Sequence, residues 1–277
     1  MLQASSPVRT LRAGDRTRAL EVCAQDPVSN VFVAARILEG GFGRGGAALL
    51  DYHDGDRTAL CWASANVVPV ECDPAAAAAF ADRVADRRRW TSSLFGPAEP
   101  VLAMWERLRP SWGEAREVRA SQPVLTTREP GPVEPDPRVR PATPEEVDLV
   151  LPAAAAMFTE EIGYPPYHGS GASYRRGVAH LVQQGRTLVR TEGGEVIFKA
   201  DLGSVALGVA QVQGVWVHPE LRGQRLAAPA MAAVVQHALR HVAPTVTLYV
   251  NDFNAPALAT YQRVGFRRTG TFTTVLL

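Results

Sequence analysis

The chain contains 277 residues, of which 46% are apolar, so it can form one large core or two ordinary ones and is not globally disordered. Its formal net charge of +1 at pH 7 gives no reason to expect nucleic acid or a membrane surface as a partner. The basic side chains are almost all Arg, with Lys199 as the only Lys, which we interpret as a compositional bias and not as a binding patch.

The cysteines and the apolar runs indicate the compartment. Cys23, Cys61 and Cys72 lack metal-ligand spacing and leave one thiol over in any disulfide scheme, so we expect reduced thiols, no metal site and a cytoplasmic protein. The segment before Gly14 has no apolar signal core, and no run of about 18 apolar residues is present that would span a membrane.

The N-terminal half alternates between strand and helix patterns in the order β-α-α-β-β-β-α-β-α-β. After a strand at Val8 and a helix that follows a polar turn, the expected elements are a helix over 30–38, strands over 47–52, 58–63 and 66–70, a helix over 73–87, a strand over 92–95, a helix over 99–108 and a strand over 116–125. Asp73 is the expected N-cap of its helix.

A boundary between two domains is predicted in the middle of the chain. Four prolines lie between Glu129 and Pro137, and this composition is typical of an extended linker. The segment after Val139 begins as the segment after Val8 does, with a short strand, a polar turn and an apolar-periodic helix. We therefore expect domains over residues 1–128 and 139–277, joined by a linker over 129–138.

The run from Gly214 to Ala227 predicts an anion-binding site. It consists of a strand over 209–217, a tight loop and a helix from about residue 226 to residue 241, in whose first turn Pro229 is tolerated. The first turn of a helix has unpaired N–H groups and the positive end of the helix dipole, which together favour a phosphate. An ordinary strand–loop–helix connection is the alternative interpretation.

A second signal follows this helix. The run Thr245–Val250 predicts a strand, and the next helix has Asn254 as a candidate N-cap, Pro256 in its first turn and Gly265 as its end. Residues 266–276 alternate loosely and predict a final strand.

Together the two segments resemble the GNAT superfamily of N-acetyltransferases. Arg222 and Ala227 match the ends of its pyrophosphate loop, Gln/Arg-x-x-Gly-x-Gly/Ala, whereas Arg225 stands at the middle glycine. The signature N-x-x-A-x-x-x-Y-x-x-x-G-F is matched by Asn254, Ala257, Tyr261, Gly265 and Phe266. The resemblance implies an α/β fold of two tandem GNAT-like domains, each a mostly antiparallel twisted sheet flanked by helices, as in tandem GNAT proteins of actinobacteria.

The resemblance also implies an acyl-CoA-dependent N-acyltransferase, which transfers acetyl from acetyl-CoA to a primary amine of a small molecule or a protein. Tyr261 is then the candidate proton donor to the leaving sulfur, unless its ring only packs in the core. The implied cofactor-binding residues are Val215, Trp216, Val217, Arg222, Gly223, Gln224, Arg225, Leu226, Ala227, Asn254, Ala257 and Tyr261.

The general base has several candidates. Glu160 and Glu161 precede the aromatic run from Gly163 to His168, in the region that the resemblance assigns to the acceptor pocket, and they are the expected catalytic carboxylates; solvated surface acids are the alternative. Asp201, Gln211, Gln213 and His218 are further candidates, although Gln can only hold a water. Tyr164, Tyr167, His168 and Trp216 are candidates to line the acceptor pocket with an aromatic surface that binds a cation. The alternative is that they are core residues and loop anchors.

The N-terminal copy is expected to be degenerate. Glu71 and Asp73 place acids where a phosphate would need donors, and residues 99–108 lack the Asn…Tyr signature. A CoA-binding sensor or interaction protein with little or no catalysis is therefore the alternative function, and transfer of a longer acyl group is a third. The acceptor and the oligomeric state stay open.

Overall fold

The computed structural model describes residues 7–43, 47–55 and 57–277, which form two compact units. The first unit comprises the chain up to Val124 together with Tyr249–Phe253 and Arg268–Leu277, and the second comprises Leu125–Leu248 and Asn254–Arg267. These units differ from the expected domains, because residues 125–138 belong to the second unit, whereas Tyr249–Phe253 and the last strand belong to the first.

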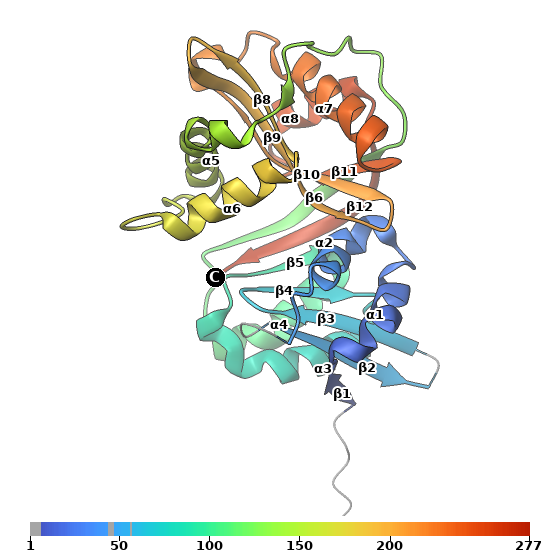
Figure 1. Cartoon of the computed structure of the whole chain (residues 1–277). Coiled ribbons are helices and arrows are strands. Elements are labelled where there is room, and N and C mark those ends of the chain that lie inside the picture. The colour runs from blue at the N-terminus through green and yellow to red at the C-terminus, as the bar shows by residue number, and fades with distance from the viewer. Residues whose placement is uncertain (1–6, 44–46, 56) are drawn as a thin grey trace, which may run out of the picture. The chain divides into compact units, whose positions relative to one another are not determined.

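The first unit follows the element order that the sequence predicts (Figure 1). Its elements are β1 (Val8–Thr10), η1 (Ala13–Asp15), α1 (Arg16–Cys23), α2 (Pro27–Leu38), β2 (Ala48–Asp54), β3 (Arg57–Ala63), β4 (Asn66–Val70), α3 (Pro74–Val84), η2 (Ala85–Trp90), β5 (Ser93–Pro97), α4 (Ala98–Trp112) and β6 (Glu117–Thr127). Its strand order is β1-β2-β3-β4-β5-β12-β6, with β4 and β5 parallel.

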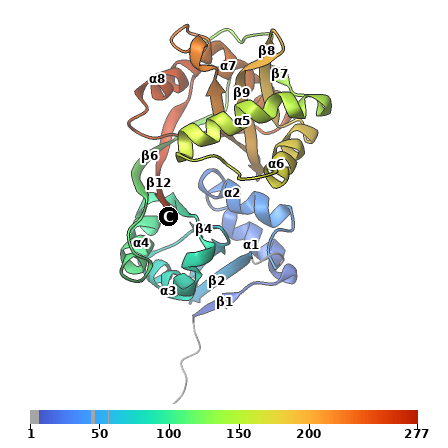
Figure 2. The same cartoon turned by 90° about the vertical axis from the view of Figure 1, so that its left-hand side faces the viewer.

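The second unit repeats the same order of helices and strands. Its elements are β7 (Arg140–Pro141), η3 (Pro144–Glu146), α5 (Val147–Ile162), α6 (Ala172–Gln183), β8 (Thr187–Glu192), β9 (Glu195–Ala206), β10 (Val209–Val217), η4 (Pro219–Leu221), α7 (Ala227–His241), β11 (Thr245–Tyr249) and α8 (Ala255–Val264), and the order is completed by β12 (Arg267–Leu276), which from Arg268 onward belongs to the first unit. Its strand order is β11-β10-β9-β8-β7, and α5 and α6 cover one face of this sheet while α7 and α8 cover the other (Figures 1 and 2).

Both units are therefore mostly antiparallel, twisted sheets flanked by helices, which confirms the fold class. In the first unit, α3 and α4 bury Phe80, Leu94 and Met104 against the sheet. In the second unit, α5 and α6 bury Val150, Val182 and Trp216.

The last strand pairs in a way that its sequence does not reveal. β12 lies antiparallel to β5, from the pair Phe272 and Pro97 to the pair Leu276 and Ser93, and Val275 is buried in the core of the first unit. The alternation of apolar residues predicts that this segment is a strand, but it carries no information about the strand with which the segment pairs.

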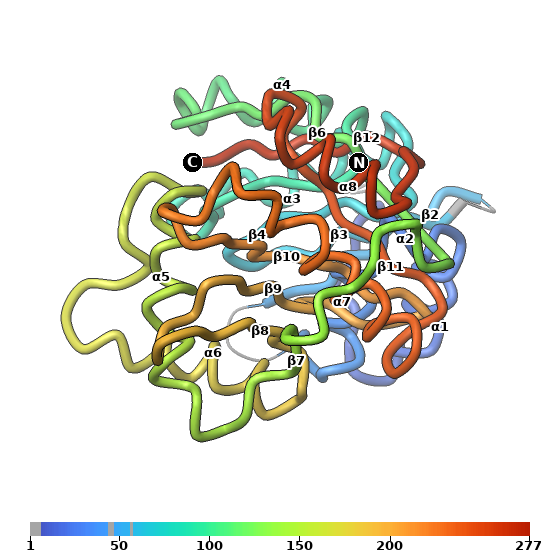
Figure 3. Tube along the Cα trace, turned by 90° about the horizontal axis from the view of Figure 1, so that it is seen from above, coloured from blue at the N-terminus to red at the C-terminus, as the bar shows by residue number. Residues whose placement is uncertain are grey.

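Residues 129–138 pack against the second unit and do not extend as a free linker. The Asp136 N–H donates to the Pro229 carbonyl oxygen, at 3.0 Å, in the first turn of α7. A Cβ added at Gly131 would lie 1.9 Å from the Val264 carbonyl oxygen at the end of α8, so only glycine fits there. Figure 3 shows this segment in green between β6 and β7, beside α7.

Candidate functional site

The sheet of the second unit opens between β10 and β11. These two parallel strands are in register only over three pairs, from Val209 with Thr245 to Gln211 with Thr247. Beyond Gln211, the residues of β10 have no register partner on β11 within the described chain. The C-terminal half of β10 therefore presents main-chain groups to an extended ligand, which is how an edge strand binds one.

A β-bulge interrupts β10 at this opening. Gln213 is in register with Asp201 of β9 and Trp216 with Lys199, so one extra residue stands on β10 between the two pairs. Gly214 takes a φ of +59°, a left-handed conformation that glycine adopts without strain and that is common at bulges.

The loop after β10 leads to a helix whose N-terminus has no side-chain cap. α7 has 15 residues, and no side chain accepts a hydrogen bond at its N-cap, Leu226. Three other helices have such caps, provided by Asp26 of α2, Asp73 of α3 and Asn254 of α8. Pro229 is the third residue of α7, as the sequence predicts, and removes only an N–H that has no partner in the helix. The remaining N–H groups of this turn are suited to an anion.

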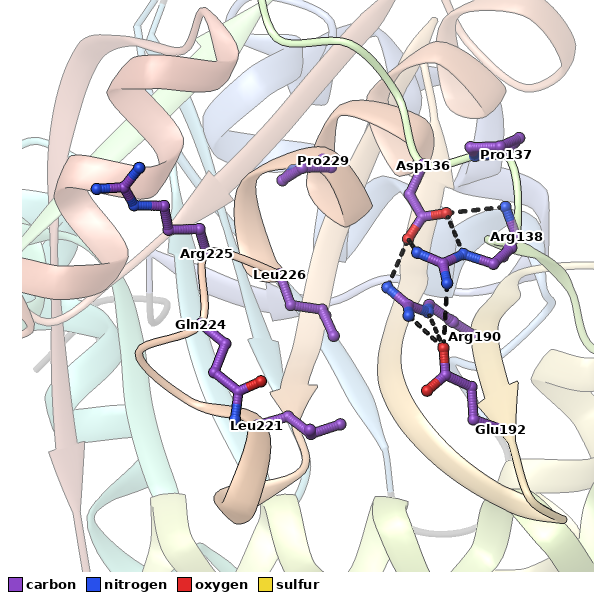
Figure 4. Close-up of a pocket in the computed structure, with 10 residues that line it drawn as sticks. All are labelled: Asp136, Pro137, Arg138, Arg190, Glu192, Leu221, Gln224, Arg225, Leu226 and Pro229. Carbon is purple, nitrogen blue, oxygen red and sulfur yellow. Dashed lines mark hydrogen bonds and ion pairs between the residues drawn. The ribbon is translucent and has the colours of Figure 1, made fainter.

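Arg225, which stands where the family loop pattern has glycine, adopts a backbone conformation that glycine favours. Arg225 takes a φ of +61° and Gly223 a φ of +78°, so both lie in the left-handed region. An L-residue in this conformation costs roughly 1–2 kcal/mol, which explains why the family pattern has glycine at this position. The Arg225 side chain extends away from Asp136 and Arg190 (Figure 4).

The helix α8 is capped at both ends as its sequence predicts. Asn254 Oδ1 accepts from the Ala257 N–H at 3.2 Å, and Gly265 ends the helix with a φ of +104°. Tyr261 is 7% exposed, and its ring packs edge-on against Phe266 at 5.9 Å between centroids. Burial raises the pKa of Tyr261, and the negative charge of Glu161 raises it further, so the hydroxyl stays protonated at neutral pH and can donate.

Glu160 and Arg222, which the sequence places in different roles, form an ion pair. Arg222 Nη2 lies 2.8 and 2.9 Å from the two carboxylate oxygens of Glu160, and Arg222 Nε donates to the Val217 carbonyl at 3.0 Å. Trp216 Nε1 donates to the same carboxylate at 3.3 Å. Glu160 therefore joins α5, β10 and the loop, and its oxygens are engaged by donors.

The other candidate bases lie in different surroundings. Asp201 is 7% exposed, accepts from Thr187 Oγ1 at 2.8 Å and is paired with Lys199. The side chain of Gln213 covers Gly203, where a Cβ would approach it to 2.0 Å. The His218 ring packs edge-on against Trp216, with centroids 5.7 Å apart.

The candidate aromatic surface is only partly assembled. Tyr164 packs on Phe158 at 5.9 Å and Tyr167 on Tyr174 at 5.6 Å, and Phe158 and Tyr174 complete the cluster. Trp216 lies in the buried core under α5, so it does not share the exposed surface of Tyr164 and Tyr167. Sequence reasoning missed Phe158 and Tyr174 because both lie within helices that read as ordinary core.

A pocket of about 460 Å³ lies on one side of the α7 loop (Figure 4). Arg190 Nη1 donates to Asp136 at 2.7 Å, and Arg138 pairs with both Asp136 and Glu192. Burial alone would raise the pKa of Asp136, but hydrogen bonds from Arg138 and the charge of Arg190 outweigh it and lower that pKa. Sequence patterns do not predict this pocket, because the composition of residues 129–138 is typical of an extended linker.

The corresponding loop of the first unit contains carboxylates. Asp73 Oδ1 accepts from the Ala76 N–H at 2.8 Å and so caps α3, while Glu71 takes a φ of +48° and accepts from Asn30 Nδ2 at 2.7 Å. A phosphate at this helix N-terminus would meet negative charge, and the degeneracy of this copy stays a prediction.

The described residues contain neither a candidate metal-binding cluster nor a candidate membrane-spanning helix. No three His, Cys, Asp or Glu side chains of the described chain are grouped so that they would hold a metal ion. No helix among these residues is long and apolar enough to cross a membrane.

Comparison with protein families finds a match in each half of the chain. Residues 157–266 match the acetyltransferase (GNAT) family, and residues 47–150 match a domain of unknown function, DUF4081. Comparison with curated proteins finds no match. The match to the acetyltransferase (GNAT) family thus lies in the C-terminal half of the chain.

Solved structures match over nearly the whole chain. A GCN5-related N-acetyltransferase from Sphaerobacter thermophilus has 18% identity and a TM-score of 0.60, with 97% of this chain and 95% of that chain covered. A tandem GNAT protein from the clavulanic acid biosynthesis pathway has 16% identity and a TM-score of 0.56, with 97% and 98% covered. A Drosophila protein has 13% identity and a TM-score of 0.63, with 99% of each covered. At these identities the likeness shows a shared tandem fold.

Proposed function

We propose that this protein is an acyl-CoA-dependent N-acyltransferase, which transfers acetyl from acetyl-CoA to a primary amine of a small molecule or a protein. The observation that carries the proposal is the uncapped N-terminus of α7, which follows the strand edge opened between β10 and β11. The family match over residues 157–266 includes both features.

The residues present fit acetyl-CoA. The pyrophosphate would be held by main-chain N–H groups from Arg222 to Ala227, where the helix dipole favours an anion and no carboxylate caps the helix. Main-chain groups of Val215, Trp216 and Val217 on the open side of β10 would hold the pantetheine arm, as an added strand is held. Asn254, Ala257 and Tyr261 would line the α8 side. When bound, acetyl-CoA supplies an activated thioester.

Tyr261 is the proposed acid. Its raised pKa keeps the phenol protonated, so the hydroxyl can donate to a sulfur that gains negative charge. A buried side chain at 7% exposure also excludes competing water. In this arrangement the base is Glu161, whose charge already acts on Tyr261, while Glu160 holds Arg222.

The reaction is tested by release of free thiol from acetyl-CoA with a panel of amines. We expect amine-dependent thiol release and an acetylated amine by mass spectrometry, with release abolished when the amine is omitted. Absence of release with every amine tested, together with saturable CoA binding, would contradict the enzymatic proposal.

That outcome would favour a CoA-binding sensor. The Glu160–Arg222 pair supports this second function, because it engages the carboxylate of Glu160, one of the two candidate catalytic carboxylates, in an ion pair. A cytoplasmic location, the identity of the amine and any oligomer remain predictions.

A further inference from the structure

A buried ion pair lies directly beneath the bulge of β10. Lys199 is 1% exposed and Asp201 7%, and the Lys199 ammonium donates to Asp201 Oδ2. Lys199 Nζ also donates to the Gly214 carbonyl oxygen at 3.3 Å. A Cβ added at Gly214 would lie 3.0 Å from Asp201 Oδ2 and 3.1 Å from Lys199 Nζ, so the pair fills the space under the bulge.

The pair is tied to three neighbouring strands. Asp201 and Lys199 stand two residues apart on β9, on the same face of the sheet. Thr187 of β8 donates to the second carboxylate oxygen of Asp201 at 2.8 Å, and Gly214 belongs to β10. The ammonium therefore has a fixed position between a carboxylate and the bulge.

Stability alone does not account for this pair. Removing two charges from water costs more than their attraction returns in many proteins, and apolar replacement of a buried ion pair is often neutral or stabilising. The chain moreover has 29 Lys and Arg residues, of which Lys199 is the only Lys. A compact ammonium fits beneath a bulge where the larger, planar guanidinium would not.

The bulge is the part of β10 that the proposed acyl donor would contact. Gly214 and Val215 have no register partner on β9 or β11 within the described pairs, so the peptide that joins them lies outside the regular ladder. The Gly214 carbonyl and the Val215 N–H belong to this one peptide. A charged donor on the carbonyl polarises the peptide and makes its N–H a stronger donor.

We propose that Lys199, held by Asp201, is a positioning residue that fixes and polarises the Gly214–Val215 peptide, so that the Val215 N–H stabilises the negative charge that develops on the thioester oxygen. This inference rests on the proposed acyltransferase function. Oriented main-chain donors of this kind act on the transition state more than on the bound ground state. The pair should therefore affect kcat much more than the affinity for CoA, which α7 determines.

The test uses the full chain with two near-isosteric substitutions. Lys199→Met alone leaves a buried carboxylate without its partner and is expected to unfold the second unit in part. The double variant Lys199→Met/Asp201→Asn removes both charges, keeps an acceptor for Thr187 and should fold. Val182→Ala is the matched control, because Val182 lies on α6, is 2% exposed in the core of the second unit and does not belong to β9 or β10.

We expect the double variant to lose tenfold or more in kcat, because the Val215 N–H would no longer be fixed and polarised by the charge of Lys199. The CoA dissociation constant should stay within about twofold of wild type. Its amide exchange over residues 212–217 should be faster than in wild type. Val182→Ala should change stability but neither kcat nor exchange at the bulge.

Two outcomes separate this inference from the function on which it rests. Wild-type kcat and unchanged exchange at 212–217 in the double variant would overturn the role of Lys199 and leave the acyltransferase proposal intact. No CoA binding or turnover by the wild-type protein would overturn the acyltransferase proposal and with it the role of Lys199 in stabilising the thioester oxygen.

Discussion

Replacing Arg225 with glycine isolates the conformational cost of the α7 loop. Arg225 holds a φ of +61°, which is left-handed, and the family pattern has glycine at this position. Arg225→Ala removes the guanidinium but retains a Cβ in the unfavourable conformation, whereas Arg225→Gly removes both. The difference between the two variants therefore measures the backbone contribution without the charge.

The magnitude follows from two opposing effects. A Cβ in the left-handed region costs roughly 1–2 kcal/mol, and glycine loses about 0.5–1 kcal/mol more than alanine through its greater freedom in the unfolded chain. The glycine variant should thus be more stable than the alanine variant by about 0.5–1 kcal/mol. This corresponds to a rise in Tm of about 2–3 °C for a unit of this size.

Thermal and urea unfolding of the two variants, without ligand, measure this difference. The affinity for CoA, measured in parallel by calorimetry, should be equal in both variants if main-chain N–H groups hold the pyrophosphate. An alanine variant as stable as the glycine variant, or more stable, would refute the conformational reasoning at this position.

The remaining predictions concern the acid, the pH dependence and the first unit. Tyr261→Phe should lower kcat roughly ten- to a thousandfold with an unchanged CoA dissociation constant, and unchanged turnover would remove Tyr261 from the mechanism. Arg140 lowers the pKa of Glu146 to about 2 from 4.5, so the stability contributed by this pair is present above pH 4.5 and is lost as pH falls toward 2. Acid titration of unfolding should show this loss in wild type and a smaller one in Glu146→Gln. Asp73→Ala should cost about 1 kcal/mol of stability through loss of a helix cap, with no change in CoA affinity; weakened CoA binding would indicate a cofactor role for the first unit.

Local elements were predictable because each carries its own signal. Asn254 and Gly265 mark the two ends of α8 in the sequence, and the structure confirms both. The order of elements in the first unit likewise follows from hydrophobic periodicity and turn residues. The succession of a strand, a loop and a helix around Arg222 and Ala227 is also a local pattern that does not depend on any distant contact.

The partners of these elements were not predictable. The alternation in β12 says nothing of its pairing with β5, and the composition of residues 129–138 says nothing of their packing on α7 and α8. The same reason applies to side chains in the site. Glu160 reads as a candidate base from its position after an apolar helix, but its ion pair with Arg222 joins residues 62 positions apart.

The position of Lys199 beneath the bulge is the clearest example of a feature that composition does not predict. As the only Lys in the sequence, it indicates no more than a bias toward Arg, and its partner Asp201 is one of several candidate bases. Only the register of β9 against β10 places both beneath the bulge at Gly214.

The central claim is that the uncapped N-terminus of α7 binds the pyrophosphate of CoA. Thermal unfolding with and without CoA tests it most directly, with Leu226→Asp as the perturbation and Leu226→Met as the control, because methionine is uncharged and does not cap a helix. Linkage predicts about 2.7 kcal/mol of stabilisation at a ligand concentration of about 100 Kd. This corresponds to a Tm rise of about 5–10 °C in wild type and in the Met variant, with loss of that rise in the Asp variant. No rise in wild type at millimolar CoA, or an equal rise in all three proteins, would contradict the account.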